Sequence, residues 1–171
     1  MQRRLSRDET FMRMVFTLAH RSTCLRRRVG CILTDVNGHV LATGYNGVAA
    51  GAPHCIDEPC PGANEPSGQG LDKCQAIHAE QNALLQCKNT LAIHTAYCTD
   101  SPCIHCVKLL MNTSCQRIVF AREYPHSDSE ELWWKHFHGN RRRDTIPGLK
   151  TKFLDNHWIL FPRDKLGGLM L

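Results

Sequence analysis

The chain has 171 residues, of which 42% are hydrophobic and 22% charged, and its formal net charge is +5. This length suits one compact domain with its own core, and the composition excludes a fibrous or largely disordered protein. No run of about 18 apolar residues predicts a membrane helix, and residues 1–10 lack the apolar stretch of a signal peptide, so we expect a cytoplasmic protein.

The first part of the chain predicts a helix followed by a β-hairpin. An apolar periodicity over residues 11–19, preceded by acidic residues, favours an amphipathic helix. Residues 29–35 predict a buried strand. The dipeptide Asn37-Gly38 favours a tight turn, so we expect residues 39–45 to form the antiparallel partner.

The middle of the chain predicts a long loop and then alternating elements. Residues 46–74 are rich in glycine, proline and alanine and lack periodicity, and irregular loops of this length in compact domains are usually functional. The elements expected after this loop are helices at residues 78–87, 103–111 and 127–138 and strands at residues 95–99 and 117–121. Their alternation favours parallel pairing in an α/β layered sheet.

The end of the chain has a weaker pattern than the rest. After residue 140 the aromatic positions are isolated and show little regular spacing. We therefore expect a domain over residues 1–140 and a C-terminal extension, residues 141–171, packed on it.

Two short segments carry the chemistry of the chain. Ten cysteines in a reducing compartment indicate metal ligation, catalysis or burial rather than disulfides. The segments are H-A-E at residues 78–80 and P-C-I-H-C at residues 102–106, and each lies at the start of a predicted helix. His78, Cys103 and Cys106 offer three ligands to zinc and leave a fourth position for water, which is typical of a catalytic site.

Glu80 follows the proposed histidine ligand by two residues. Bound zinc lowers the pKa of its water toward neutrality, and a carboxylate beside it can carry a proton to the ring nitrogen and leaving amine of a substrate. The paired motifs are typical of zinc deaminases, whereas C-x-x-C alone also occurs in redox pairs and structural zinc sites. Because Cys103 and Cys106 face the metal, we expect His105 to point away from it.

The sequence resembles the cytidine deaminase superfamily, and within it the deoxycytidylate deaminases, over roughly residues 8–138. The matching segments are C-L-R-R-R-V-G at 24–30, T-G-Y-N-G at 43–47, H-A-E-Q-N-A at 78–83, P-C-I-H-C at 102–106 and Y-P-H-S-D at 124–128. The resemblance implies a three-layer αβα fold with a central mixed sheet of about five strands. It also implies hydrolysis of deoxycytidine monophosphate (dCMP) to deoxyuridine monophosphate (dUMP) and ammonia, which supplies dUMP for thymidylate synthesis.

The same resemblance assigns roles to individual residues. It implies that His78, Cys103 and Cys106 hold a catalytic zinc ion and that Glu80 is the proton shuttle. The residues that it implies for the sugar and phosphate of the substrate are Asn46, Arg26 and Tyr124. An arginine offers a planar fork to a phosphate, and an asparagine can both donate to and accept from a sugar. The alternative interpretations stay open: Arg26 as a surface cation, Asn46 as a turn residue and Tyr124 as a residue at the edge of the core.

A second group of cysteines lies in and before the long loop. Relatives with a second, structural zinc imply such a site, whose candidate ligands here are Cys24, Cys55, Cys60 and Cys74, with His54 as a possible replacement. A closed zinc site would offset the entropy lost when the loop is ordered. Buried thiols without a metal remain the alternative. The cysteines within predicted elements, which we interpret as small buried hydrophobes, are Cys31, Cys87, Cys98 and Cys115.

The resemblance also implies partners. It implies a homo-oligomer, commonly a hexamer, with Trp133 or Trp134 at an interface, and control by deoxycytidine and thymidine triphosphates. We expect one tryptophan to pack inward and the arginines at residues 141–143 to be solvated, so no nucleic-acid partner is expected.

Two other functions stay open. A polynucleotide-editing deaminase shares both zinc motifs but typically lacks the G-Y-N-G segment followed by a cysteine-bearing insertion. Deaminases of a free base or of a riboflavin precursor share them too. A non-catalytic zinc scaffold is the second alternative, and Glu80 argues against it because a closed structural site has no use for a proton shuttle.

Overall fold

The structure is a computed structural model that describes residues 3–66, 69–124, 128–139 and 158–169. Its centre is a five-stranded sheet with the order β2-β1-β3-β4-β5. The strands are β1 (Gly30–Thr34), β2 (Val40–Tyr45), β3 (Thr95–Asp100), β4 (Arg117–Arg122) and β5 (Trp158–Leu160). Strand β1 runs antiparallel to β2 and β3, whereas β3, β4 and β5 are parallel to one another, so the sheet is mixed as predicted.

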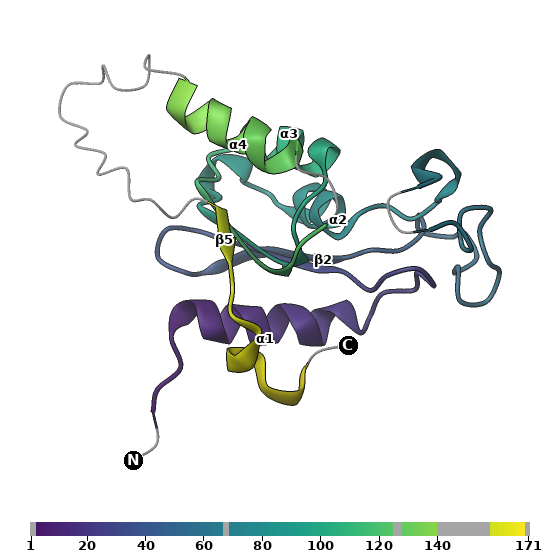
Figure 1. The fold of residues 1–171 in the computed structure, drawn as a ribbon, viewed down its shortest axis with the longest axis horizontal. Coiled ribbons are helices and arrows are strands. Elements are labelled where there is room, and N and C mark those ends of the chain that lie inside the picture. Colours follow the sequence, from purple (N-terminus) through teal and green to yellow (C-terminus); the bar gives the residue numbers. More distant parts are fainter. Residues whose placement is uncertain (1–2, 67–68, 125–127, 140–157, 170–171) are drawn as a thin grey trace.

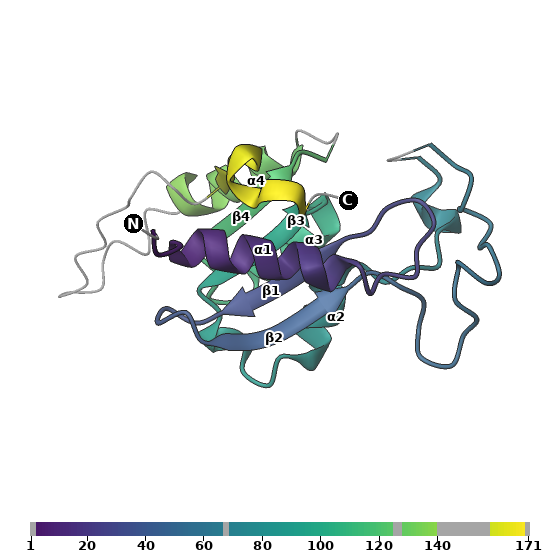
Figure 2. The ribbon, with the colours of Figure 1, turned by 90° about the horizontal axis from the view of Figure 1, so that it is seen from below.

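Helices cover both faces of this sheet, as Figures 1 and 2 show. The covering elements of one face are α1 (Arg7–Ala19) and the short helix η4 (Arg163–Leu169). Those of the other face are α2 (Ala79–Gln86), α3 (Ile104–Met111) and α4 (Asp128–Gly139), and two further short helices are η1 (Leu71–Lys73) and η2 (Thr90–Ala92). The prediction of a three-layer αβα fold is therefore confirmed.

The apolar run in β1 follows from this layered arrangement. All five residues of β1 are buried. Ile32 belongs to the core on the α1 side with Phe16 and Tyr97, whereas Cys31 and Leu33 belong to the core on the opposite side. Because successive side chains of a strand point to opposite faces, a strand covered on both faces carries apolar residues at consecutive positions, here residues 31–33.

The predicted hairpin between β1 and β2 is present. Gly38 has a φ of +86°, a conformation that glycine adopts without steric cost, and its N–H donates to the carbonyl oxygen of Asp35 at 3.1 Å. The helix predicted over residues 11–19 is also present, as α1.

The C-terminal extension contributes more regular structure than its pattern predicts. Strand β5 adds to the edge of the sheet beside β4, and Phe161 and Leu166 pack in the core under α1. A three-residue strand is too short to show an alternating pattern, which is why the sequence did not reveal it. The division at residue 140 stays a prediction, and residues 141–143 lie outside the described residues.

The two neighbouring tryptophans have different environments. Trp133 is 1% exposed and Trp134 is 60% exposed, so one of them packs inward as expected. Among the residues that the structure describes, no helix has the length and apolar character that crossing a bilayer requires.

Candidate metal centre and substrate pocket

The N-terminal ends of α2 and α3 bring the two sequence motifs together. His78 directly precedes α2, Cys103 directly precedes α3, and Cys106 lies in the first turn of α3. The Nδ1 atom of His78 lies 3.4 Å from the Sγ atom of Cys103 and 3.4 Å from that of Cys106. These three donor atoms all lie within 4.8 Å of one another.

Helix α2 is placed by its close packing on the end of β2. A Cβ atom at Gly44 would lie 2.2 Å from the carbonyl oxygen of Ala79 and 2.4 Å from the backbone nitrogen of Ala83, so only glycine allows this approach. The side-chain amide of Asn82 donates to the carbonyl oxygen of Tyr45 at 2.8 Å. These contacts hold the first turn of α2, and with it His78, at the edge of the sheet.

The three-residue group fits a zinc ion. With zinc–sulfur and zinc–nitrogen bonds of about 2.3 and 2.1 Å, tetrahedral geometry separates a sulfur from a nitrogen by about 3.6 Å, close to the observed 3.4 Å. Hydrogen bonds from Cys106 and His78 lower the pKa of the Cys103 thiol to about 3, whereas the pKa of Cys106 is raised. A thiolate is therefore already favoured at Cys103. His105 is exposed and is not part of the group, as predicted.

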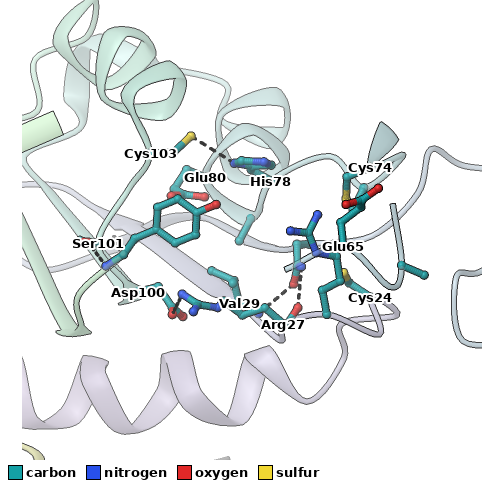
Figure 3. Close-up of a pocket in the computed structure, with 16 residues that line it drawn as sticks. Cys24, Arg27, Val29, Glu65, Cys74, His78, Glu80, Asp100, Ser101 and Cys103 are labelled. Atoms are coloured by element: carbon teal, nitrogen blue, oxygen red, sulfur yellow. Dashed lines mark hydrogen bonds and ion pairs between the residues drawn. The ribbon is translucent and has the colours of Figure 1, made fainter. Parts of the chain in front are cut away.

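Glu80 lies in the same cavity as the metal-binding group without belonging to it. Figure 3 shows it on the same side of the pocket as Cys103 and His78. The residue is only 4% exposed, and this burial raises the pKa of its carboxyl to about 7. A carboxyl with such a pKa is suited to both accepting and releasing a proton near neutral pH.

The three predicted substrate residues line this cavity, whose volume is about 200 Å³. Asn46 accepts from the N–H of Val29 and donates to the carbonyl oxygen of Arg27, both at 2.8 Å. Arg26 donates to the carbonyl oxygens of Pro66 and, at 2.9 Å, Gln69. The N–H of Tyr124 donates to the hydroxyl of Ser101 at 2.7 Å.

Two further charged residues line the cavity and were not singled out from the sequence. Arg27 donates from Nη1 to the carboxylate of Asp100 at 2.8 Å, and its guanidinium lies 5.2 Å from the centre of the Tyr124 ring. In a run of three arginines, spacing does not distinguish one from its neighbours. Asp100 offered a signal, because it is an acidic residue that directly follows the strand predicted over residues 95–99.

The second group of cysteines lies beside the cavity. Cys24, Cys55 and Cys60 are buried, and the Sγ atoms of Cys55 and Cys60 lie 3.7 Å apart. Burial raises the pKa of Cys60, but backbone hydrogen bonds at Gln75 and a hydrogen bond from Cys55 outweigh it, so the net pKa is lowered. Cys74 and Cys24 both line the cavity wall.

This second group is less tightly gathered than the first. Of the cysteines that the structure describes, no three sulfur atoms in and before the loop lie within 4.8 Å of one another. His54 is exposed. Among the remaining cysteines, Cys31, Cys98 and Cys115 are buried in the core as expected, and Cys87 is half-buried.

Comparisons with known proteins agree with this geometry. The family model for the cytidine and deoxycytidylate deaminase zinc-binding region matches residues 5–122. Over 148 residues, 84% of this chain, the chain is 38% identical to a deoxycytidylate deaminase from Schizosaccharomyces pombe. It is 37% identical over 123 residues to a deoxycytidylate deaminase from Mycobacterium phage D29, which is 68% of this chain and 94% of the phage protein.

A solved structure supports the same similarity. The dCMP deaminase of cyanophage S-TIM5, in complex with dCMP and dUMP, matches with a TM-score of 0.61 and 26% identity. The match covers 79% of this chain and 95% of the cyanophage protein. By contrast, the chain spans only 45% of the length of the Schizosaccharomyces pombe protein.

Proposed function

Because this chain belongs to the cytidine and deoxycytidylate deaminase zinc-binding family, we propose that it hydrolyses dCMP to dUMP and ammonia. The observation that carries the proposal is the presence of Glu80 in one cavity with the group of His78, Cys103 and Cys106. A group with three ligands leaves one position of a tetrahedral metal for water, and a buried carboxyl beside it provides for proton transfer.

The proposed reaction adds water to the cytosine ring and releases its amino group. Zinc bound at the site supplies Lewis acidity when it is present. The Glu80 carboxylate accepts the proton that water loses as its oxygen bonds to ring carbon C4, and donates it to ring nitrogen N3. Glu80 then accepts the second proton, from the hydroxyl now bonded to C4, and donates it to the amino group as the carbon–nitrogen bond breaks, so that C4 becomes a carbonyl, ammonia leaves and the carboxylate is restored.

We assign Asn46, Arg26 and Tyr124 to the sugar and phosphate of the nucleotide. Their support is that all three line the cavity that contains Glu80. The side-chain oxygen and nitrogen of Asn46 each make one hydrogen bond to the backbone of Val29 or Arg27. Because an amide oxygen can accept two hydrogen bonds and an amide nitrogen can donate two, each atom can still bond to a sugar hydroxyl.

The experiment that tests this function is ammonia release from dCMP, deoxycytidine, cytosine and a short single-stranded DNA, with zinc measured in the same sample. We expect turnover of dCMP well above that of the other three compounds. Turnover of the DNA alone would move the protein to the polynucleotide-editing class. Bound zinc without any turnover would instead favour the non-catalytic zinc scaffold.

We further propose a second, structural zinc held by Cys24, Cys55, Cys60 and Cys74. Its support is the burial of three of these residues and the contact between Cys55 and Cys60, in a loop that has little regular structure of its own. The metal would offset the entropy of ordering this loop.

The substitution Cys60→Ser tests the second zinc. We expect the wild-type chain to carry about two zinc ions and the variant about one, with a lower melting temperature, because a structural site contributes folding energy. Cys87→Ser is the matched control, since Cys87 lies outside both groups, and it should keep both ions. A wild-type chain with one zinc ion would contradict the proposal.

The family resemblance also supports a homo-oligomer, a hexamer in our proposal, with deoxycytidine and thymidine triphosphates as effectors and a cytoplasmic location. Sedimentation gives the number of subunits, and dCMP turnover with each triphosphate tests the effectors.

A further inference from the structure

The three consecutive arginines at the pocket lie in three different environments. Arg26 donates to the carbonyl oxygens of Pro66 and Gln69 in the long loop. Arg28 is exposed and does not line the cavity. Arg27 lines the cavity with a side chain that is 31% exposed, and it is bound to Asp100.

Asp100 is a buried carboxylate shared by two guanidinium groups. It is 3% exposed. Its Oδ1 atom accepts from Arg27 at 2.8 Å, and its Oδ2 atom accepts from Arg122 at 2.7 Å and from the hydroxyl of Thr99 at 2.8 Å. One negative charge between two positive charges leaves an excess positive charge at the pocket wall. A buried carboxylate is tolerated when it is paired and hydrogen-bonded in this way.

Other contacts orient Arg27 further. The Tyr124 ring lies 5.2 Å from its guanidinium. Its carbonyl oxygen accepts from Asn46 at 2.8 Å. The cavity also contains Glu65, whose carboxylate is bound by Lys73 at 2.6 Å, so its charge is already met by a cation. A guanidinium fixed in advance loses less freedom when it binds a ligand, and its planar fork matches a phosphate.

Arg27 and the metal-binding group lie on opposite sides of the pocket. Figure 3 shows Arg27 and Asp100 on the side of the pocket away from Cys103 and His78. A nucleotide whose ring reacts beside Cys103 and His78 has its phosphate on the other side of the sugar. The anionic end of such a substrate therefore extends toward the wall that carries Arg27.

We propose that Arg27 determines specificity for substrates that carry a phosphate monoester, and that Asp100 is the positioning residue that aims its guanidinium into the pocket. This inference rests on the proposed function, since it concerns the phosphate of the nucleotide that the enzyme deaminates. It extends the phosphate site beyond Arg26, whose guanidinium also donates to the loop.

The first test measures equilibrium binding of dUMP and deoxyuridine by calorimetry at about 0.15 M salt. We expect Arg27→Gln to weaken dUMP binding about tenfold or more, since a hydrogen bond to a charged group is lost. Deoxyuridine binding should stay within about twofold. Arg28→Gln is the matched control and should leave both affinities within about twofold. Arg27→Lys should recover part of the loss, because it restores the charge without the fork.

The second test measures the kinetics of Asp100→Asn. We expect a several-fold rise in KM for dCMP with kcat within about threefold, and an unchanged kcat/KM for deoxycytidine. A merely structural role would lower both activities equally. Where Asp100→Asn fails to fold, the Arg27 variants still decide the matter, because they leave the pair of Asp100 and Arg122 intact.

The outcomes separate this inference from the proposed function. Absence of turnover for every cytosine compound, with dUMP binding lost in Arg27→Gln, overturns the proposed function and supports the phosphate site. If the wild type turns over dCMP, the proposed function stands. This inference alone is then overturned if Arg27→Gln weakens the binding of dUMP and deoxyuridine equally, or leaves dUMP binding unchanged. Equal wild-type affinity for dUMP and deoxyuridine overturns it as well.

Discussion

At the residue scale, Glu80 shares a cavity with His78 and Cys103 but lies outside the group that could hold a metal. His78 lies directly before α2 and Glu80 lies in its first turn, so a two-residue spacing places both side chains in one cavity. The motif is short enough that local helix geometry places both residues. For this reason the sequence alone could predict that His78 and Glu80 lie close together in one site.

We expect Glu80→Gln to lower kcat for dCMP by about 10²-fold or more, the range that general acid–base groups contribute. The amide is close in size to the carboxyl but cannot accept and release the proton. Zinc content, measured by atomic absorption, should equal that of the wild type. Loss of zinc together with activity would instead show that Glu80 is structural.

Stability at low pH depends on a residue at the start of α1. Glu9 accepts from Arg3 and from the backbone N–H of Ser6, and these bonds lower the pKa of its carboxyl from 4.5 to about 2. A carboxyl whose pKa is lowered by folding stabilises the protein above its unfolded pKa, and this contribution is lost as pH falls toward the folded value.

We therefore expect the free energy of unfolding of the wild type to fall between pH 4.5 and about 2. The variant Glu9→Gln should lose less over the same range, because the amide does not titrate. Urea unfolding at several pH values provides the measurement. Parallel pH profiles for the two proteins would show that Glu9 does not contribute this stability.

At the scale of elements, the position of His78 depends on the packing of α2 against β2. A Cβ atom at Gly44 would overlap the backbone of α2 at Ala79, which directly follows His78. Since backbone atoms cannot rotate away, the helix itself would have to shift. The distance between the metal-binding groups of α2 and α3 therefore depends on this glycine.

Gly44→Ala is expected to lower the free energy of unfolding by about 1–3 kcal/mol, the usual cost of overpacking, and to lower kcat for dCMP. Gly168→Ala is the control, because a Cβ atom there meets nothing within 4 Å. Unfolding curves and dCMP kinetics measure the two effects. A Gly44→Ala protein as stable and active as the control would mean that α2 tolerates the shift.

At the scale of the whole molecule, the two ends of the described chain share one layer. Helix η4 packs against α1, and Leu166 and Phe161 join Phe11 and Val15 in one core cluster. The strand that precedes η4 completes the sheet beside β4. Residues 158–169 are therefore part of the folded unit, although they lie beyond the segment that the family model matches.

We expect Leu166→Ala to cost about 2–5 kcal/mol of stability, the range for removing a large buried aliphatic side chain. Leu166 is 1% exposed, whereas Leu160, the control for the same substitution, is 54% exposed. Thermal unfolding of both variants gives the comparison. Equal effects would show that η4 does not anchor the C-terminal segment.

The features that the sequence by itself determined are those with local causes. Turn chemistry sets the hairpin at Gly38, and apolar patterning sets β1. Ligand chemistry with short spacing identifies His78 and Cys103 as candidate zinc ligands. Each depends on residues close together in the chain, whose preferences hold before the rest of the molecule folds.

Only the tertiary structure decided which distant residues meet. Arg27 and Asp100 are 73 positions apart, and nothing in a run of arginines indicates which of them pairs with Asp100. Strand β5 exists because β4 offers an edge to pair with, and three residues carry no periodicity of their own. The physical reason is common to both: a long-range contact depends on how layers pack, and local patterns do not encode that packing.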